Sequence, residues 1–335
     1  MKKILLILTG GTIGSRIDAD GNISPTAQPL LLSLCKNAYE NRAEISVSEP
    51  FCCLSENMTT AEREALIKEI IAHKNAGFDG IIVAHGSDTL CYTASLAAMA
   101  LRWFSVPVVF IASDYVLSDS RTNGKANFES AVDLICDGSL MRGTFICYRD
   151  ERGENSVYLP TRLISAEPMF DSFTPADKTR FGKMENGRFV YENSPLNPTV
   201  SEINAEREAV CGDDFTLADN VLLIHSSPYF DPMRLDLCGV SAVINYGYHC
   251  GTVSEISFLP FAKRCEELGI TIYMASFKDP DAPIYESLKE ILNCKNVKRL
   301  YNITPEAATA KITLAHSANL NILDEELYFE EINVI

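Results

Sequence analysis

The chain has 335 residues, of which 47% are hydrophobic and 22% charged, as expected of a globular protein with two domains or one large one. Its formal charge of -16 disfavours nucleic acid as a partner, because a negative surface repels phosphate backbones. The 11 cysteines are irregularly spaced and include no Cys-x-x-Cys pair, which argues against disulfides or a zinc site and favours reduced thiols in the cytoplasm.

The N-terminal apolar run at 4–8 is too short for a signal peptide, and we expect a strand that is buried on both faces. No segment approaches the length of a membrane span, so no membrane partner is expected. Strand-like runs and helical patterns then alternate along the first half of the chain. The predicted strands lie at 45–53, 80–84 and 107–112, and the predicted helices at 30–39, 59–75, 90–101 and 127–136.

This alternation predicts an α/β fold with a largely parallel sheet. Thr59 and Glu62 form a predicted capping box at the start of one of the helices. The polar segment 186–214 contains Pro195 and Pro198 and is the predicted linker between a larger N-terminal domain, 1–185, and a smaller C-terminal one, 215–335. The alternation resumes there, with predicted strands at 221–224, 240–245 and 270–275 and predicted helices at 284–292 and 304–315.

Three polar motifs directly follow predicted strands. The run TGGT at 9–12 offers two glycines for a tight turn and the hydroxyl of Thr12, which is either a nucleophile or a cap of the next helix. Its glycine spacing does not match a dinucleotide fingerprint, which makes a dehydrogenase an unfavoured alternative.

The second motif, HGSDT at 85–89, supplies a hydroxyl at Ser87 and a carboxylate at Asp88, which either bind a ligand or cap the helix that starts near Thr89. The third, SEN at 55–57, supplies Ser55 and Glu56. Since parallel strands end at one edge of a sheet, the three motifs together predict a ligand site at that edge.

The run LTGGTIG at 8–14 and the run HGSDT at 85–89 resemble the two N-terminal signatures of the L-asparaginase family, which usually has threonine at the position of Ser87. The pair Ser55 and Met58 resembles the family's substrate-binding segment. The pair Asp231-Pro232 is similar to the start of the second domain, and the run TPEAATAK at 304–311 looks like the last helix. The resemblance implies two Rossmann-like domains, no metal or cofactor, a cytoplasmic location and a homodimer or homotetramer.

The resemblance also implies a function, the hydrolysis of the side-chain amide of L-asparagine, or of a close amino-acid amide, to aspartate and ammonia. Thr12 would attack the amide and form an acyl-enzyme. Ser87 and Asp88 match the first two members of an assisting threonine–aspartate–lysine group. Asp88, Ser55 and Glu56 would bind the substrate's α-ammonium and α-carboxylate ends. Backbone amides at the glycines, for which we single out Gly11 and Gly86, would stabilise the oxyanion.

The sequence departs from the family pattern at three places. The family's lysine has no counterpart before residue 170, and Arg162, the nearest cation, either takes its place or forms a salt bridge. The loop tyrosine is replaced by NISP at 22–25, with Tyr115 and Tyr248 as conceivable substitutes. The C-terminal loop reads YGYHCGT at 246–252, so His249 either reaches substrate in a partner chain or is structural.

These departures motivate an alternative, a catalytically weak or inactive relative that binds a small amino acid. A further alternative is the asparaginase-like subunit of the archaeal tRNA-dependent amidotransferase. That subunit normally carries an extra N-terminal domain, whereas the first motif here begins within about ten residues of Met1, so we expect this alternative not to hold. The acidic residues Glu325, Glu326, Glu330 and Glu331 are expected to form a solvated face.

Overall fold

The computed structural model describes residues 1–18, 20–25, 30–167, 169–317, 320 and 322–332. The chain divides into two compact units, Met1–Thr216 and Leu217–Ile335, and each is built from a sheet with helices packed against it, so the predicted α/β class is confirmed. The segment 186–214 falls within the first unit, where it contains a strand and a short helix. Among the described residues, no helix combines the length and apolar character needed to cross a bilayer.

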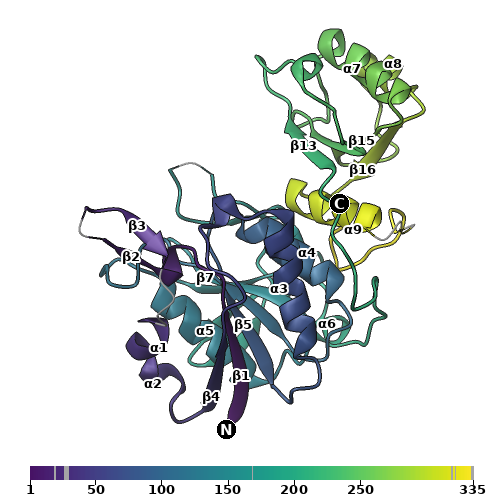
Figure 1. Cartoon of the computed structure of the whole chain (residues 1–335). Helices are drawn as coiled ribbons and strands as arrows, with labels where there is room; N and C mark the ends of the chain where they lie inside the picture. Colours follow the sequence, from purple (N-terminus) through teal and green to yellow (C-terminus); the bar gives the residue numbers. More distant parts are fainter. Residues whose placement is uncertain (19, 26–29, 168, 318–319, 321, 333–335) are drawn as a thin grey trace. The chain divides into compact units, whose positions relative to one another are not determined.

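The first unit is organised around an eight-stranded sheet of order β12-β11-β8-β7-β6-β5-β1-β4 (Figure 1). The five strands from β4 to β7 run parallel, and the last three are added antiparallel. The strands are β1 (Lys2–Leu8), β4 (Ala43–Ser48), β5 (Gly80–Ala84), β6 (Val108–Ile111), β7 (Thr144–Arg149), β8 (Asn155–Tyr158), β11 (Gly182–Glu185) and β12 (Arg188–Tyr191).

The centre of this sheet is buried on both faces, which explains the continuous apolar runs. Every residue of β5 is buried, and Ile4 to Ile7 of β1 are at most 2% exposed. Within the layers, α3 packs beside α4 and α2 beside α5. The helices are α1 (Leu30–Leu34), α2 (Lys36–Tyr39), α3 (Thr60–Ala72), α4 (Leu90–Ala100), α5 (Gly124–Asp137) and α6 (Val200–Ile203).

Helix starts follow local sequence signals closely in α3. The Thr59 hydroxyl accepts a hydrogen bond from the Ala61 amide at 3.2 Å, and the Glu62 carboxylate accepts one from the Thr59 amide at 2.8 Å. The predicted capping box is therefore confirmed. The run at 90–101 is apolar on all sides because only Tyr92 of α4 is not buried.

The second unit is a four-stranded parallel sheet of order β13-β14-β15-β16. One face packs on α7 and α8 through Val243 and Ile272, and the other packs on α9 through Ile244 and Tyr273. The elements are β13 (Val221–His225), β14 (Ala242–Tyr246), α7 (Glu255–Glu267), β15 (Thr271–Phe277), α8 (Glu286–Leu292), β16 (Val297–Tyr301) and α9 (Pro305–Ser317). The sequence patterns missed α7 and β16.

The expectation of a solvated acidic face is wrong for Glu330, whose side chain is 0% exposed. Its carboxylate lies 3.0 Å from the ammonium of Lys311 on α9 and accepts hydrogen bonds from the Leu327 and Tyr328 amides. A buried carboxylate needs such partners because the low-dielectric interior does not solvate it. The pair thus ties the C-terminal segment to α9.

We predict that Lys311→Met destabilises the protein by about 3–5 kcal/mol, because it leaves the Glu330 carboxylate buried without its counter-ion. Urea unfolding measures this change. Lys36→Met is the matched control, since Lys36 forms an exposed i,i+4 pair with Glu40 and should cost less than about 1 kcal/mol. Equal losses in the two variants would contradict the prediction.

Candidate active site

The end of β1 is held between two neighbouring strand ends. The amide and hydroxyl of Thr9 both donate to the Ala84 carbonyl at the end of β5, at 3.1 and 2.9 Å. On the other side, the Cys53 amide donates to the Thr9 carbonyl and the Gly11 amide to the Cys53 carbonyl, each at 3.0 Å. The segment after β4 therefore returns to β1 and pairs with it again at a parallel bridge between Gly10 and Cys53.

Two glycines allow this approach because no side chain fits at their positions. Gly10 and Gly11 have φ angles of 104° and 68°, a region that L side chains rarely adopt. A Cβ on Gly10 would lie 2.1 Å from the Cys53 carbonyl oxygen, and one on Gly11 would lie 2.4 Å from the Cα of Gly86. The first motif is thereby packed directly on the second.

The third motif meets the other two at the same point. A Cβ on Gly86 would lie 2.5 Å from the hydroxyl oxygen of Ser55, which is 2% exposed and begins the short helix η2 (Ser55–Asn57). The Thr89 hydroxyl donates to the Ser55 carbonyl at 3.0 Å and joins the two loops further. The three strand ends named by the sequence therefore converge around Gly11, Ser55 and Gly86.

Thr12 follows Gly11 as the first residue of the short helix η1 (Thr12–Gly14) and is half-buried. Gly11 occupies the N-cap position of η1, so the capping position that was the alternative for Thr12 is filled by a residue without a side chain. The Ser15 hydroxyl donates to the Gly11 carbonyl at 2.7 Å and holds this turn. The hydroxyl of Thr12 is thus placed next to the convergence point without serving as the cap.

The loop after β5 is supported from below by a neutral imidazole. His85 is 0% exposed, and burial lowers its pKa to about 4. Its Nδ1 lies 2.8 Å from the Gly86 carbonyl oxygen. At the start of α4 the N-cap is Thr89, which makes no side-chain cap bond, so Ser87 and Asp88 lie one and two positions outside the cap.

Two carboxyl groups from different motifs share a hydrogen bond beside this loop. Partial burial raises the pKa of Asp88, and the neighbouring carboxyl of Glu56 raises it further through its charge and a hydrogen bond. Two like charges at short range favour keeping one proton or binding a cation. The pair Glu56 and Asp88 therefore has the electrostatics of a site for an ammonium group.

A cavity of about 340 Å³ opens beside Ser87 and Asp88 at the carboxyl ends of the parallel strands. Thr12, Ser55 and Glu56 are not among its lining residues, although their motifs adjoin it through Gly11 and Gly86. The remaining lining residues are Asp114, Tyr148, Ala166, Glu167, Met169, Phe170, Asp171 and Phe173.

Several of these lining residues were missed by the sequence patterns. Asp114 follows β6 as the motifs follow β1, β4 and β5, so the same strand-end signal was available for it. Its carboxylate is held by the amides of Tyr115 and Asn123, at 2.8 and 2.9 Å. Tyr148 lies within β7, an unpredicted strand, and donates to the Asp171 carbonyl at 3.0 Å.

Arg162 does not line this cavity. It is 8% exposed at the end of the short helix η3 (Pro160–Arg162), where its guanidinium donates to the Leu196 carbonyl. Its Nη1 also lies 3.8 Å from the fully buried carboxylate of Asp177. Of the two interpretations left open by the sequence, these contacts match the salt bridge.

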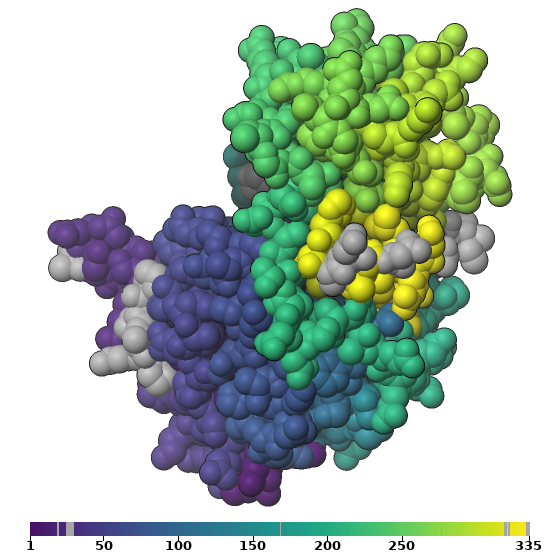
Figure 2. All heavy atoms as spheres, turned by 45° about the vertical axis from the view of Figure 1, so that its right-hand side comes forward, coloured from purple at the N-terminus to yellow at the C-terminus, as the bar shows by residue number. Residues whose placement is uncertain are grey.

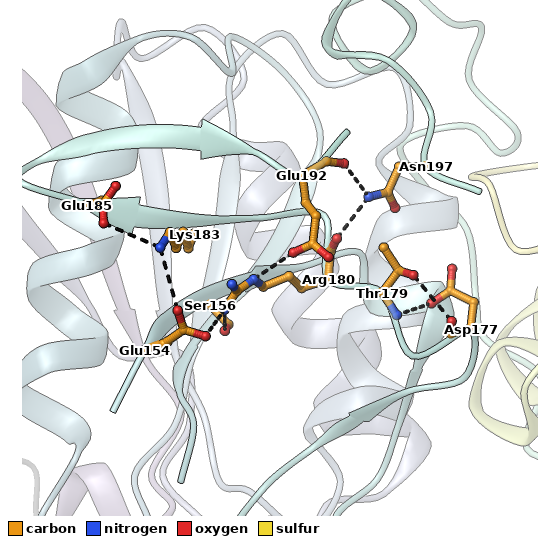
Figure 3. Close-up of polar contacts among 9 residues, drawn as sticks. All are labelled: Glu154, Ser156, Asp177, Thr179, Arg180, Lys183, Glu185, Glu192 and Asn197. Atoms are coloured by element: carbon orange, nitrogen blue, oxygen red, sulfur yellow. Dashed lines mark hydrogen bonds and ion pairs between the residues drawn. The ribbon is translucent and has the colours of Figure 1, made fainter. Parts of the chain in front are cut away.

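The next cations along the chain are also held in ion pairs, which Figure 3 shows. Arg180 lies 2.7 Å from Glu154 and 2.8 Å from Glu192. Lys183 lies 3.6 Å from Glu154 and 3.4 Å from Glu185. Among the described residues, the cavity beside Ser87 is therefore lined by carboxylates and apolar groups and by no lysine or arginine.

The segment that replaces the family's tyrosine loop forms the second strand of a hairpin. Strand β2 (Ser15–Ile17) pairs antiparallel with β3 (Ile23–Pro25), and the purple hairpin stands out from the surface of the first unit in Figure 2. Ile17 and Ile23 are 54% and 49% exposed. Tyr115, one conceivable substitute for the tyrosine, has the guanidinium of Arg121 stacked 4.0 Å from its ring.

Comparison with known proteins identifies the family. The family model "Asparaginase, N-terminal" matches residues 3–197. The D-type subunit of the glutamyl-tRNA(Gln) amidotransferase of Thermoplasma acidophilum is 37% identical over 92% of this chain and 74% of its own length. The protein of the same name from Methanosphaera stadtmanae is 28% identical over 98% of this chain and 74% of its own length.

Solved structures agree at the level of the fold. The thermostable L-asparaginase from Thermococcus kodakarensis superposes with a TM-score of 0.81 at 19% identity, covering 99% of this chain and 100% of that one. Since the family model covers more than half of the chain and a relative 37% identical covers most of it, the chain belongs to the asparaginase family.

Proposed function

We propose that this protein hydrolyses the side-chain amide of L-asparagine, or of a close amino-acid amide, through a covalent ester on Thr12. The observation that carries the proposal is the convergence of Gly11, Ser55 and Gly86 at one edge of the sheet. Thr12 and Ser87 are the residues that directly follow two of these three, which sets both hydroxyls at the same edge. Membership of the asparaginase family supports amidohydrolase chemistry in general.

In the proposed reaction, the Thr12 oxygen bonds to the amide carbon while its proton is transferred to the leaving nitrogen. Ammonia departs, water adds to the ester, and the product leaves as a carboxylate with the Thr12 hydroxyl restored. Ser87 and Asp88 assist the proton transfer. Backbone amides beside Gly11 and Gly86 stabilise the negative oxygen that forms in both steps, because fixed dipoles need no reorganisation.

The amino-acid end of the substrate is assigned to the third motif and to the acidic pair. An α-ammonium group between Glu56 and Asp88 neutralises two carboxyls that otherwise repel each other. The α-carboxylate is assigned to the side of Ser55, whose hydroxyl faces Gly86. We give Arg162 no chemical step, because its described contacts are those of a buried ion pair.

A binding protein with little or no turnover is the second candidate. It is favoured by one observation, the lack of a lysine or arginine among the described residues that line the cavity beside Ser87. Without that cation, less assistance is available for removing the proton from a hydroxyl. Ammonia release from asparagine and glutamine separates the candidates. No release, together with a higher Tm in aspartate, would establish the binder.

A role as the ammonia-releasing part of an amidotransferase is favoured by the names of the curated relatives. It differs from the first proposal in substrate, since glutamine would then be preferred to asparagine, and in needing another protein chain to use the ammonia. Comparing kcat/KM for the two amides in the isolated chain tests this. The cytoplasmic location and the homodimer or homotetramer remain predictions.

We predict that Thr12→Ala lowers kcat at least about a thousandfold, because it removes the nucleophile. Thr12→Ser should retain measurable turnover, since it keeps the hydroxyl. Ser87→Ala should cost nearly as much as Thr12→Ala, because groups that act as a unit are not additive. Ammonia release and Tm are measured together, and unchanged kcat in Thr12→Ala would overturn the assignment of the nucleophile.

The raised pKa of Asp88 predicts a pH dependence of substrate binding. Asp88 binds an ammonium group only when ionised, so KM should rise as the pH falls through this raised pKa. Glu56→Gln removes the neighbouring charge, lowers the pKa of Asp88 and should move the acid limb of kcat/KM to lower pH. Glu40→Gln, on the exposed end of α2, is the control. An unmoved limb in Glu56→Gln would refute the coupling.

The ion pair of Arg162 with Asp177 predicts a structural phenotype. Arg162→Lys should lower Tm, because lysine cannot reproduce the guanidinium's directed bonds to both Asp177 and the Leu196 carbonyl. Its kcat should stay within about twofold of the wild type. A clear increase in kcat would instead show that position 162 takes the place of the family lysine.

A further inference from the structure

The loop that follows β14 carries a thiol and an imidazole at the tip of a tight turn. The Gly251 amide donates to the Tyr248 carbonyl at 2.7 Å, which closes a β-turn with His249 and Cys250 at its centre. The Tyr248 amide donates to the Thr252 carbonyl at 2.9 Å and anchors the base of the turn. The turn therefore holds the two neighbouring side chains at fixed backbone positions.

The thiol of Cys250 contacts two groups that favour its reaction as a thiolate. Its Sγ lies 3.0 Å from Nε2 of His249, close enough for the imidazole to accept the thiol proton. The phenol of Tyr285 hydrogen-bonds the same sulfur, and this bond raises the pKa of Tyr285. A phenol that keeps its proton is a donor to a thiolate. Cys250 is half-buried, so the sulfur is reachable from solvent.

A cavity of about 190 Å³ adjoins this thiol within the second unit. His249, Cys250 and Tyr285 line one part of it, and Phe277, Lys278 and Arg299 line another. The guanidinium of Arg299 lies 5.9 Å from the ring centre of Phe277 and forms no ion pair with another described residue. Two cations against a single lining carboxylate, that of Asp279, favour a small anionic ligand.

We propose that Cys250 is a thiol–disulfide exchange site for low-molecular-weight disulfides that carry a carboxylate. The Cys250 thiolate attacks one sulfur of the disulfide, a new S–S bond forms, and the original S–S bond breaks. The leaving thiolate takes the proton that Cys250 lost, through His249. The disulfide is the only oxidant, and the products are the Cys250 mixed disulfide and one free thiol.

The other cysteines lack this combination. Burial raises the pKa of Cys35 and of Cys265 to about 11, and it also raises the pKa of Cys147. Burial and the nearby Glu49 raise the pKa of Cys52. Cys238 is exposed in the same unit as Cys250, but no described imidazole contacts its thiol, which makes it the matched internal control.

The test treats the intact protein with dithiodiglycolate, which carries two carboxylates, or with cystamine, which carries two ammonium groups. Peptide mass spectrometry then follows the adducts on Cys250 and Cys238. With dithiodiglycolate, Cys250 should react about tenfold faster than Cys238, and faster than Cys250 reacts with cystamine. Equal rates at the two cysteines would overturn the proposal.

Variants separate the two contributions. His249→Gln should slow Cys250 about tenfold and leave Cys238 unchanged, because only Cys250 has an adjacent imidazole. Arg299→Gln and Lys278→Gln should each reduce the preference for dithiodiglycolate over cystamine. A preference retained in both would refute the carboxylate specificity. Because the readout is adduct mass and not ammonia, the result is independent of the proposed amidohydrolase function.

Discussion

The close approach of three loops at the ends of β1, β4 and β5 is the constraint on which the rest of the site depends. Gly11 and Gly86 lie so near each other that a methyl group on Gly11 would overlap the backbone of Gly86. Gly86 in turn faces the Ser55 hydroxyl. Close-packed backbone cannot yield to an added side chain, so the glycines set where the following hydroxyls lie. The relative placement of Thr12, Ser55 and Ser87 follows from this packing.

The electrostatics of the site favour binding of a cation more clearly than activation of a nucleophile. Glu56 and Asp88 share a hydrogen bond, and further carboxylates line the cavity beside Ser87. The nearby cations are bound elsewhere, Arg162 to Asp177 and Arg180 to two glutamates. These ion pairs stabilise the region beyond β7, but they leave the proton of Thr12 with few described acceptors. Substrate recognition is therefore better supported than fast turnover.

The second unit repeats the parallel α/β plan with different polar features. Lys311 and Glu330 form a buried ion pair where the sequence suggested only a solvated acidic segment. The turn after β14 places Cys250 beside His249 and Tyr285, next to a cavity with two cations. Neither feature belongs to the three strand-end motifs of the first unit. The second unit therefore carries chemistry of its own.

The sequence by itself determined the α/β class, most elements of the parallel sheets and the three motifs. Apolar runs such as 80–84 and the capping box at Thr59 are local signals, and local signals survive folding. Tertiary structure alone decided the partners of Arg162, the burial of Glu330 and the cavity residues from Asp114 to Asp171. These depend on contacts between segments far apart in the chain, and the charge of a side chain does not reveal which distant group will neutralise it.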